Sequence, residues 1–474
     1  MNEVLKLSGR AQARLIRDRG ISSVELIAAH LARIDDVNPA LNAVVEVLRE
    51  SALESARKSD LEKRGRPLEG VPFSVKDSIE VEGTVCTAGT LGYRDNPPSR
   101  RDATLVARLR SAGAIPIART NLPDLLFAFE SDNLIYGRTN NPHDLSRSSG
   151  GSSGGEAALI AACGSPFGLG SDAAGSVRLP AHYCGIASIK PTSGRLPRTG
   201  HVPPAGGWIE MIWQIGPMAR RVEDLVLMLQ LLVGADGEDL SVVSMPFDSG
   251  PRHTPLRIAF FTDNGILAAD AATAETVARA AKALVAEGFY VEEMRPPGIE
   301  QSYDLEMRLL GADGGDGLRI FVKAIGNHPT HPLLEGWLGK LASCRMDLTQ
   351  FAAFWSELDR FRAAMYTFLN RFDAILSPVA AFPAVHHGHS TDDTIFPGYS
   401  YTMTHNMTGW PAAAIPYGTS PEGLPIGVQI AGAPWREDLV LGIAALLEKS
   451  QTVNQAGDIP RPEPVIDIHD RHVA

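Results

Sequence analysis

The sequence predicts an α/β protein in which helices cover both faces of a mixed or parallel β-sheet. Short apolar segments that alternate like strands are followed repeatedly by longer segments with apolar residues three and four positions apart. This alternation of strands and helices is typical of α/β folds with a buried sheet. A chain of 474 residues has room for about three average domains, although large α/β folds often form one unit.

The first predicted element is a helix that begins close to residue 22. Ser22 and Glu25 have the spacing of a capping box, in which each side chain accepts a hydrogen bond from the other residue's backbone N–H group. Ile27, Leu31 and Ile34 then fall on one helical face. We expect this face to be buried against the rest of the protein.

The next predicted element is a strand with the sequence VPFSVKDSI, at 71–79. Val71, Phe73 and Val75 alternate with polar positions that include Lys76, which is a strand signature. Successive side chains of a strand point to opposite faces. We therefore expect Lys76 close to the strand end, on the face opposite the apolar side chains.

The rest of the chain continues the alternation. Further helices are predicted where apolar residues recur at helical spacing, at 103–113, 156–164, 222–234, 274–289 and 351–369. Further strands are predicted in short apolar runs, at 114–118, 186–190, 255–261, 289–294, 374–382 and 426–432. The aromatic residues of 351–369 recur three and four positions apart, so we expect this helix to pack them into the core.

Charge and hydropathy narrow the class of partners. The formal net charge is −11, which gives no electrostatic attraction for nucleic acid or for an anionic membrane surface. The longest apolar run, 225–235, is too short to span a bilayer. The N-terminus lacks the apolar segment of a signal peptide. We expect a soluble protein that binds neither nucleic acid nor membranes.

Cysteine and histidine usage bears on compartment and cofactors. The four cysteines are Cys86, Cys163, Cys184 and Cys344. They form no CxxC pair and are too few for a disulfide framework in so long a chain, so a reducing cytoplasm fits best. The thirteen histidines, including the pair at 386–387, show no metal-binding spacing. We predict neither a metal nor another cofactor.

A Gly/Ser octet, SSGGSSGG at 148–155, resembles a flexible linker. The neighbouring sequence favours a ligand-binding or catalytic segment instead of a linker. An apolar helix begins directly after the octet, and GSDAAGSVRLP follows at 170–180. Glycines ahead of a helix let backbone N–H groups approach a bound oxygen closely. A nucleotide-binding loop is poorly supported, since the sequence contains no GxxxxGK[ST] element.

The octet also contains a short hydrolase motif. Gly150, Ser152 and Gly154 match GxSxG, the nucleophile elbow of α/β-hydrolases. That elbow must follow a strand, whereas the preceding residues 140–148 are polar and typical of a loop. An α/β-hydrolase is therefore a weak alternative.

Four longer spans resemble the amidase signature family. They are VKDSIEVEGTVCTAGT, RTNNPHDLSRSSGGSSGGEAALIAACG, GSDAAGSVRLPAHYCGIASIKPTSGRL and NMTGWPAAAIPYG…EGLPIGVQIAG. They occur in the family's order over nearly the whole chain, and the Gly/Ser block followed by SDxAxSxRxPA is highly specific. The resemblance implies a single large α/β/α sandwich with a twisted mixed β-sheet covered by helices.

The resemblance also implies how the chain is organised. We expect N-terminal helices packed on the core at 1–70, the signature core at 71–244 and a variable substrate-side region of the same domain at 245–370. Residues 371–455 are expected to return to the core sheet, and 456–474 to form a polar tail.

The family's Ser–cisSer–Lys triad falls on Lys76, Ser152 and Ser176. The resemblance implies that Ser176 is the nucleophile, that Ser152 follows a cis peptide bond and relays a proton, and that Lys76 is the base. Ser153 matches a residue that steadies the lysine in the family. Amide hydrolysis needs a base for the nucleophile and an acid for the leaving amine. Neither serine-rich block contains a histidine, so Lys76 must serve as the neutral amine.

A neutral lysine at pH 7 requires a pKa well below the ordinary value of about 10.4. Burial of an ammonium group lowers a pKa by several units. An apolar strand with serine hydroxyls close by, and no adjacent salt-bridge partner, is a suitable environment for Lys76. We expect Asp77 to point to the other face of the strand.

The resemblance places the oxyanion hole on four consecutive backbone N–H groups, those of Ala173, Ala174, Gly175 and Ser176. Such donors stabilise the negative charge that develops on the carbonyl oxygen. Many family members have glycine at the second of these positions, but the alanine methyl group is tolerable where φ is negative. We expect Asp172 and Arg178 to form a scaffold pair that braces this loop.

Substrate choice depends on the apolar side chains around the triad, because binding pockets are mainly apolar with a few polar groups. The candidate pocket residues are Leu126, Phe129, Trp208, Ile209, Trp213, Tyr399 and Trp410. They resemble the hydrophobic-pocket branch of the family, which includes fatty acid amide hydrolases and urethane-cleaving amidases. We predict an amidase that cleaves hydrophobic or aryl amides through an acyl-enzyme. Small-molecule esters and carbamates are further expected substrates, because a carbamate offers the same carbonyl group.

Three alternatives stay open at this point. A small primary-amide amidase is the first, and an amidotransferase A-type subunit is the second. The A-type pattern has an aspartate seven residues before NxxGxP to hold the ammonium group of glutamine, whereas this chain has Tyr399 seven residues before Asn406. A non-catalytic partner subunit on the same scaffold is the third. The oligomeric state is open, and a homodimer is expected from the resemblance alone.

Overall fold

The computed structural model describes residues 3–62, 64–204, 206–247 and 255–454. Its strands are β1 (Val44–Val47), β2 (Pro72–Lys76), β3 (Ile115–Thr120), β4 (Phe167–Asp172), β5 (Ala187–Lys190), β6 (Gln214–Ala219), β7 (Arg257–Phe260), β8 (Tyr290–Glu293), β9 (Ala374–Pro378), β10 (Ala412–Thr419) and β11 (Pro425–Gly432). The polar tail predicted at 456–474 lies outside the described residues.

Fourteen α-helices surround these strands in the described part of the chain. They are α1 (Gly9–Arg17), α2 (Ser23–Leu41), α3 (Arg49–Glu62), α4 (Thr104–Ser111), α5 (Gly154–Ala161), α6 (Arg178–Cys184), α7 (Val222–Leu232), α8 (Ala271–Ala286), α9 (Ser302–Leu310), α10 (Asp316–Ala324), α11 (Pro332–Ala342), α12 (Leu348–Phe368), α13 (Ser400–Met407) and α14 (Glu437–Asn454).

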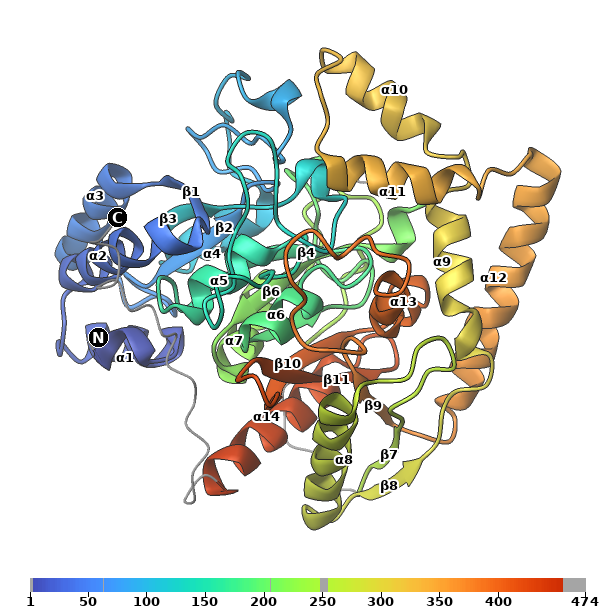
Figure 1. The fold of residues 1–474 in the computed structure, drawn as a ribbon. Coiled ribbons are helices and arrows are strands. Elements are labelled where there is room, and N and C mark those ends of the chain that lie inside the picture. The colour runs from blue at the N-terminus through green and yellow to red at the C-terminus, as the bar shows by residue number, and fades with distance from the viewer. Residues whose placement is uncertain (1–2, 63, 205, 248–254, 455–474) are drawn as a thin grey trace, which may run out of the picture.

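The strands form one mixed sheet at the centre of the molecule (Figure 1). Their order is β1-β3-β2-β4-β6-β5-β10-β11-β9-β7-β8. β2 runs parallel to both of its neighbours, β3 and β4, and β7 runs parallel to β8 and β9. The other neighbouring strands are antiparallel. The sheet is therefore mixed, as predicted.

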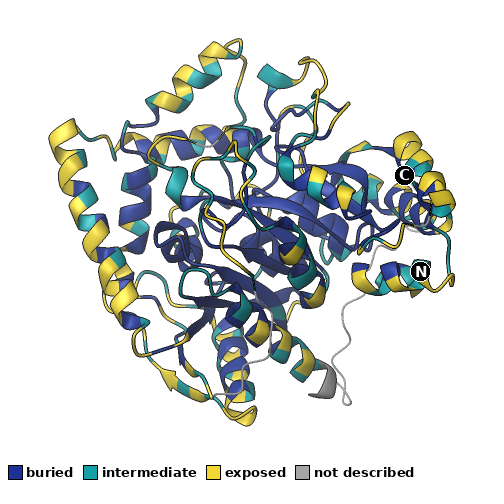
Figure 2. Cartoon of the chain, turned by 180° about the vertical axis from the view of Figure 1, so that it is seen from behind, coloured by how far each residue is buried: buried dark blue, intermediate teal, exposed yellow. Residues whose placement is uncertain are grey.

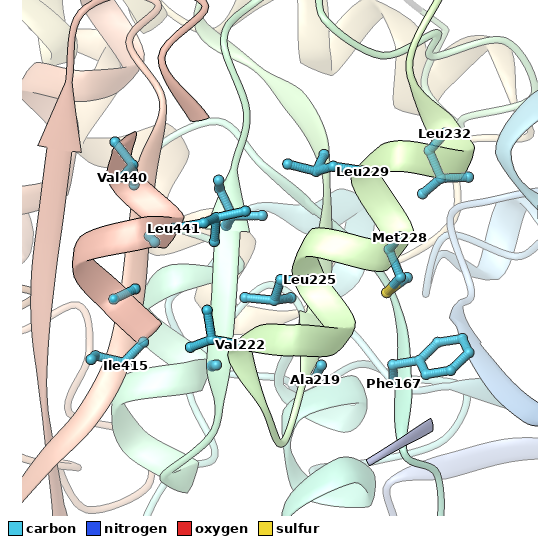
Figure 3. Close-up of a cluster of buried hydrophobic side chains, with 14 of the residues drawn as sticks. Phe167, Ala219, Val222, Leu225, Met228, Leu229, Leu232, Ile415, Val440 and Leu441 are labelled. Atoms are coloured by element: carbon cyan, nitrogen blue, oxygen red, sulfur yellow. The ribbon is translucent and has the colours of Figure 1, made fainter. Parts of the chain in front are cut away.

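Helices bury both faces of the sheet. On one face, α4, α7, α8 and α14 pack against the strands, and Figure 3 shows α7 side chains such as Leu225 and Leu229 beside Leu441 of α14. On the other face, α2, α5 and α6 enclose a second apolar core that includes Ile27 and Leu159. The two cores make the predicted α/β/α sandwich.

The predicted N-terminal helix is α2. Ser22 is its N-cap, and Ser22 and Glu25 form the predicted capping box. Ile27, Leu31 and Ile34 are fully buried, which confirms the predicted apolar face. Segment 1–70, for which the sequence predicted only helices, also supplies β1, which pairs with the edge of β3.

Strand β4 was not predicted, because its sequence FGLGSD lacks the apolar alternation of a strand. All of its residues are buried, and its glycines make room for the neighbouring helix. A Cβ atom at Gly168 would lie 1.8 Å from a carboxylate oxygen of Glu156 in α5. Close helix packing therefore replaces the alternating pattern by which strands are recognised.

The outer helices are less enclosed than the sheet. Figure 2 shows buried residues through the central strands and exposed residues along the outer helices. The predicted helix at 351–369 is α12, and its inner face buries Phe354, Leu358, Phe361, Met365 and Phe368, in agreement with the predicted aromatic stripe. None of the described helices combines the length and apolar composition that a bilayer crossing requires.

Candidate active site

The ends of two parallel strands bring the predicted site together. Lys76 is the last residue of β2, and Ser171 and Asp172 end the neighbouring strand β4. The carboxyl ends of parallel strands meet at the same edge of a sheet, where ligands of α/β proteins bind. The loop from Ala173 to Val177 continues from β4 into α6 at this edge.

The Gly/Ser octet at 148–155 is packed into the protein and is no linker, since all eight of its residues are buried. The Gly151–Ser152 peptide bond is cis, as the resemblance implied. A Cβ atom at Gly151 would lie 2.4 Å from the carbonyl oxygen of Ala128, so this position requires glycine. The octet leads into α5 from a loop and not from a strand, which is unlike a nucleophile elbow.

Lys76 is surrounded by three serine hydroxyls. Its Nζ atom lies 2.6 Å from Ser152 Oγ, 3.0 Å from Ser153 Oγ and 3.1 Å from Ser171 Oγ. The side chain is fully buried, and this burial holds the pKa of Lys76 well below its ordinary value. The charges of Asp172 and Glu156 oppose the shift only in part. Burial thus shifts the equilibrium of Lys76 toward the neutral amine.

Two acidic residues of these segments, Asp77 directly after β2 and Glu156 in α5, have other partners. Asp77 forms a buried ion pair with Arg119, so it points away from Lys76 as predicted. Glu156 accepts hydrogen bonds from the hydroxyls of Ser74 and Thr120, and burial raises its pKa to about 7. In the described part of the chain, no carboxylate forms an ion pair with Lys76.

Ser176 lies in the loop between β4 and α6. It is 8% exposed, whereas Ser152 is 1% exposed and Lys76 is fully buried. The backbone N–H of Ser153 donates a hydrogen bond to the carbonyl oxygen of Ser176 over 3.1 Å. The Oγ atom of Ser176 makes no hydrogen bond with any described residue, including Ser152. The hydroxyl that the resemblance assigns as nucleophile is therefore the most accessible of the three groups.

Asp172 braces the loop that carries Ser176. Its carboxylate accepts hydrogen bonds from the backbone N–H groups of Gly175 and Val177, at 2.8 and 3.2 Å. The Arg178 guanidinium donates to both carboxylate oxygens, at 3.0 and 2.9 Å, and Asn406 donates to one of them. The Arg178 charge holds the pKa of Asp172 below its ordinary range. The predicted Asp172–Arg178 pair is thus present.

One predicted oxyanion donor needs correction. The N–H of Gly175 is directed at Asp172 and is not available to a substrate oxygen in this structure. The hydrogen bonds of the described residues leave the N–H groups of Ala173, Ala174 and Ser176 without a protein acceptor. The expected set of four donors is thereby reduced to these three.

Two of the seven predicted pocket residues lie beside this loop. Phe129 and Tyr399 share one apolar cluster with Ala174, and their rings are 4.2 Å apart. Trp337 of α11 and Phe396 complete the same group of rings, which we call the aromatic cluster (Phe129, Trp337, Phe396 and Tyr399).

The other five predicted pocket residues lie elsewhere. Ile209 and Trp410 belong to a second apolar cluster beside α12. Trp213 is buried beneath the Arg198 guanidinium, and Leu126 packs beside α11. Trp208 is 39% exposed and donates its indole N–H to the carbonyl of Leu309. The seven residues thus belong to several apolar groups, and their role in one substrate pocket stays a prediction.

Sequence reasoning missed two groups at the lysine, and its seven pocket residues did not include two rings of the aromatic cluster. Ser171 contacts Lys76, and His201 contacts Ser171. Ser171 precedes Asp172 at the strand end, a position that could have identified it. His201 carried no such signal, because it lies outside both serine-rich blocks. Trp337 comes from a segment distant in sequence from the motifs, whereas Phe396 lies three residues before Tyr399, in the stretch FPGYSY at 396–401. Among the described residues, no three His, Cys, Asp or Glu side chains are arranged to hold a metal.

Comparison with known proteins is consistent with this geometry. Residues 25–441 match the sequence model of the Amidase family. The chain is 31% identical to human fatty-acid amide hydrolase 2 over 94% of this chain and 89% of that protein. It is 33% identical to the A-type chain of glutamyl-tRNA(Gln) amidotransferase from Syntrophobacter fumaroxidans, over 95% of this chain and 97% of that protein. The structure of 6-aminohexanoate cyclic dimer hydrolase complexed with substrate superposes with a TM-score of 0.84 at 29% identity, over 94% and 97% of the two chains.

Proposed function

We propose that this chain, which belongs to the amidase family of amide C–N hydrolases, cleaves hydrophobic or aryl amides through an acyl-enzyme on Ser176. Ser152 relays the proton and Lys76 is the base. The observation that carries the proposal is a fully buried lysine amine within 2.6 Å of the Ser152 hydroxyl. A desolvated amine can accept a proton close to neutral pH, whereas a hydrated lysine cannot.

The acylation step follows from this arrangement. Ser176 Oγ attacks the carbonyl carbon while its proton passes to Ser152 Oγ, and the proton of Ser152 passes to Lys76 Nζ. One hydroxyl can donate and accept at the same time, so Ser152 can act as the relay. The side chain of Ser176 must rotate toward Ser152 for this transfer, and catalytic hydrogen bonds often tighten only when substrate binds.

The tetrahedral intermediate then collapses. Its oxyanion is held by the free N–H groups of the 173–176 loop, and each such donor contributes roughly 2.7–4 kcal/mol in other hydrolases. The leaving amine takes the proton from Lys76 through Ser152, which leaves the acyl group bonded to Ser176 Oγ. Water then attacks the ester carbonyl carbon, and its proton passes through Ser152 to Lys76. The same proton returns through Ser152 to Ser176 Oγ as the bond between the acyl carbon and Oγ breaks, which releases the acid.

The aromatic cluster supports an apolar acyl or aryl group. Ala174, whose N–H is a proposed oxyanion donor, packs in the same cluster as the rings of Phe129 and Tyr399. A substrate carbonyl at this loop would therefore have aromatic side chains beside it. Tyr399 is fully buried and brings no carboxylate to the position that holds the ammonium group in the A-type amidotransferase chains. These features support hydrophobic amides over glutamine.

A substrate panel tests the proposal. We expect the purified chain to cleave anilides, long-chain amides, aryl esters and aryl carbamates, and not glutamine or small primary amides. Ser176→Ala should lose all of these activities. Cleavage of glutamine alone, and only with an added partner protein, would instead support an amidotransferase role.

Labelling with a fluorophosphonate separates the remaining alternatives. We expect the adduct on Ser176. An adduct on Ser152 would support an α/β-hydrolase mechanism, and no adduct would support a non-catalytic role in a larger complex. We further propose a cytoplasmic location, because the four cysteines are free in the described structure. A homodimer stays a prediction that light scattering would test.

A further inference from the structure

His201 is linked to Lys76 through one serine. The imidazole Nε2 lies 3.0 Å from Ser171 Oγ, which in turn lies 3.1 Å from Lys76 Nζ. The other ring nitrogen, Nδ1, lies 3.0 Å from the carbonyl oxygen of Pro203. The ring is buried and packs against Trp213 with 4.6 Å between ring centres. These contacts fix both the position and the tautomer of the imidazole.

The tautomer determines the direction of each hydrogen bond. A carbonyl oxygen only accepts, so the proton of His201 must be on Nδ1. Burial lowers the pKa of His201 to about 3, and the charge of Arg198 acts in the same direction, so the ring is neutral. Nε2 therefore carries a lone pair. Ser171 donates its hydroxyl proton to Nε2 and accepts a hydrogen bond from Lys76.

Ser153 is oriented in the same way. Its hydroxyl donates to the carbonyl oxygen of Ser171 over 3.3 Å, so its oxygen is also an acceptor for Lys76, at 3.0 Å. A neutral lysine amine has two N–H bonds and one lone pair. The N–H bonds are directed at Ser153 and Ser171, which leaves the lone pair facing Ser152.

We propose that His201 is a positioning residue that, through Ser171, turns the lone pair of Lys76 toward Ser152. The inference rests on the proposed function, because it assigns the orientation of the same base. Without a ring nitrogen to accept its proton, the Ser171 hydroxyl would turn and donate to the lone pair of Lys76. It would then compete with Ser152 for the catalytic base.

The test compares His201→Phe, Ser171→Ala and the double variant, with Ser78→Ala as the control. Phenylalanine keeps a ring against Trp213 and removes both nitrogens. The Ser78 hydroxyl lies 3.2 Å from the same Nε2 atom but makes no hydrogen bond with Lys76 among the described residues. Each variant is assayed on an anilide for kcat and for the pH dependence of kcat/KM, and its folding is checked by thermal unfolding.

We expect His201→Phe to lower kcat by about 10-fold to 100-fold, less than the roughly 10²–10⁴-fold that a positioned base contributes. In His201→Phe, the acid limb of the pH profile of kcat/KM should move to lower pH. The reason is that the Ser171 hydroxyl would then donate to the lone pair of Lys76 and so stabilise the neutral amine. The double variant should lose no more than His201→Phe alone, since the competing hydroxyl is gone. Ser78→Ala should keep wild-type kcat.

If His201 only maintained the fold, the pH profile and the double variant should behave in the opposite way. Water entering a loosened site would hydrate the ammonium form and move the acid limb to higher pH, and the losses in the double variant would add. Either result, or wild-type kcat in His201→Phe, would overturn the inference. If His201→Phe is unstable, His201→Leu takes its place, alone and combined with Ser171→Ala, because additive losses in that pair would also refute the inference. Activity that survives Lys76→Met would instead refute the proposed function.

Discussion

Ser153 donates its backbone N–H to the carbonyl oxygen of Ser176, so main-chain atoms join the two serine-rich segments. The neighbouring residue, Ser152, carries the hydroxyl that contacts Lys76. The proposed relay and nucleophile are therefore held close together without a bond between their side chains. The proposed first proton transfer requires a hydrogen bond between the hydroxyls of Ser176 and Ser152, which we expect to form when substrate binds.

The relay role predicts unequal effects for two serines of the octet. Ser152→Ala should lower kcat/KM by about 100-fold or more, since the proton path from Ser176 to Lys76 is cut. Ser149→Ala is the matched control, because Ser149 is also buried and, among the described residues, its hydroxyl donates a hydrogen bond only to the carbonyl of Thr139. We expect it to change kcat/KM by less than about threefold. Equal losses in the two variants would contradict the relay.

The buried lysine predicts a cost in stability. Lys76 has a lower pKa in the folded protein than in the unfolded chain, so the unfolded chain binds more protons between the folded pKa and about 10.5. Stability should therefore rise with pH through this window. Lys76→Met does not titrate, so it should be more stable than wild type at pH 7, with a difference that narrows toward pH 10.

Urea denaturation of both proteins at the two pH values measures this difference. A wild-type protein that is more stable than Lys76→Met at pH 7 would mean that the lysine is charged and paired in the folded state.

Glu306 of α9 predicts a pH dependence of opposite sign. It is fully buried, and neither carboxylate oxygen has a hydrogen-bond partner among the described residues. Burial raises its pKa well above the ordinary value, so the folded protein binds more protons than the unfolded chain above about pH 4.5. Wild-type stability should fall as pH rises through this range.

Glu306→Gln removes that titration. It should match wild type at pH 4 in thermal unfolding and exceed it at pH 8. A variant that is less stable at pH 8 would show that the carboxylate is charged and satisfied in the folded protein.

The aromatic cluster predicts a change in substrate preference. Phe129→Leu removes a ring whose centre is 4.2 Å from that of Tyr399, so KM should rise several-fold for anilides of long-chain apolar acids and little for acetanilide. Phe372→Leu is the control, because Phe372 packs against Phe368 in a different apolar cluster. Parallel changes in the two variants would indicate a general loss of stability. They would argue against a role of the cluster in binding.

Much of the site could be predicted because it lies in local motifs. Lys76 ends a strand that is visible as alternating residues, and the glycines around Ser152 indicate close packing. The Asp172–Arg178 pair spans the short loop between β4 and α6, so its partners are neighbours in sequence. These positions depend on short-range geometry, which a sequence pattern records.

Other parts depend on how distant segments fold together. His201 reaches Ser171 because the chain after β5 returns across the end of β2, where Val202 donates its N–H to the carbonyl of Ser78. The aromatic cluster unites Phe129 with Trp337, more than 200 residues apart. Trp213 is in the core because Arg198 and His201 cover it. No local periodicity encodes these contacts.

The rate at which a fluorophosphonate modifies Ser176, measured against pH in wild type and in Lys76→Met, shows whether a neutral Lys76 activates the nucleophile. We predict that one ionisation well below 10.5 controls the wild-type rate, and that Lys76→Met reacts about 10²–10⁴-fold more slowly without this ionisation. A wild-type rate that still rises through pH 10, or the same profile in both proteins, would contradict this role of the lysine.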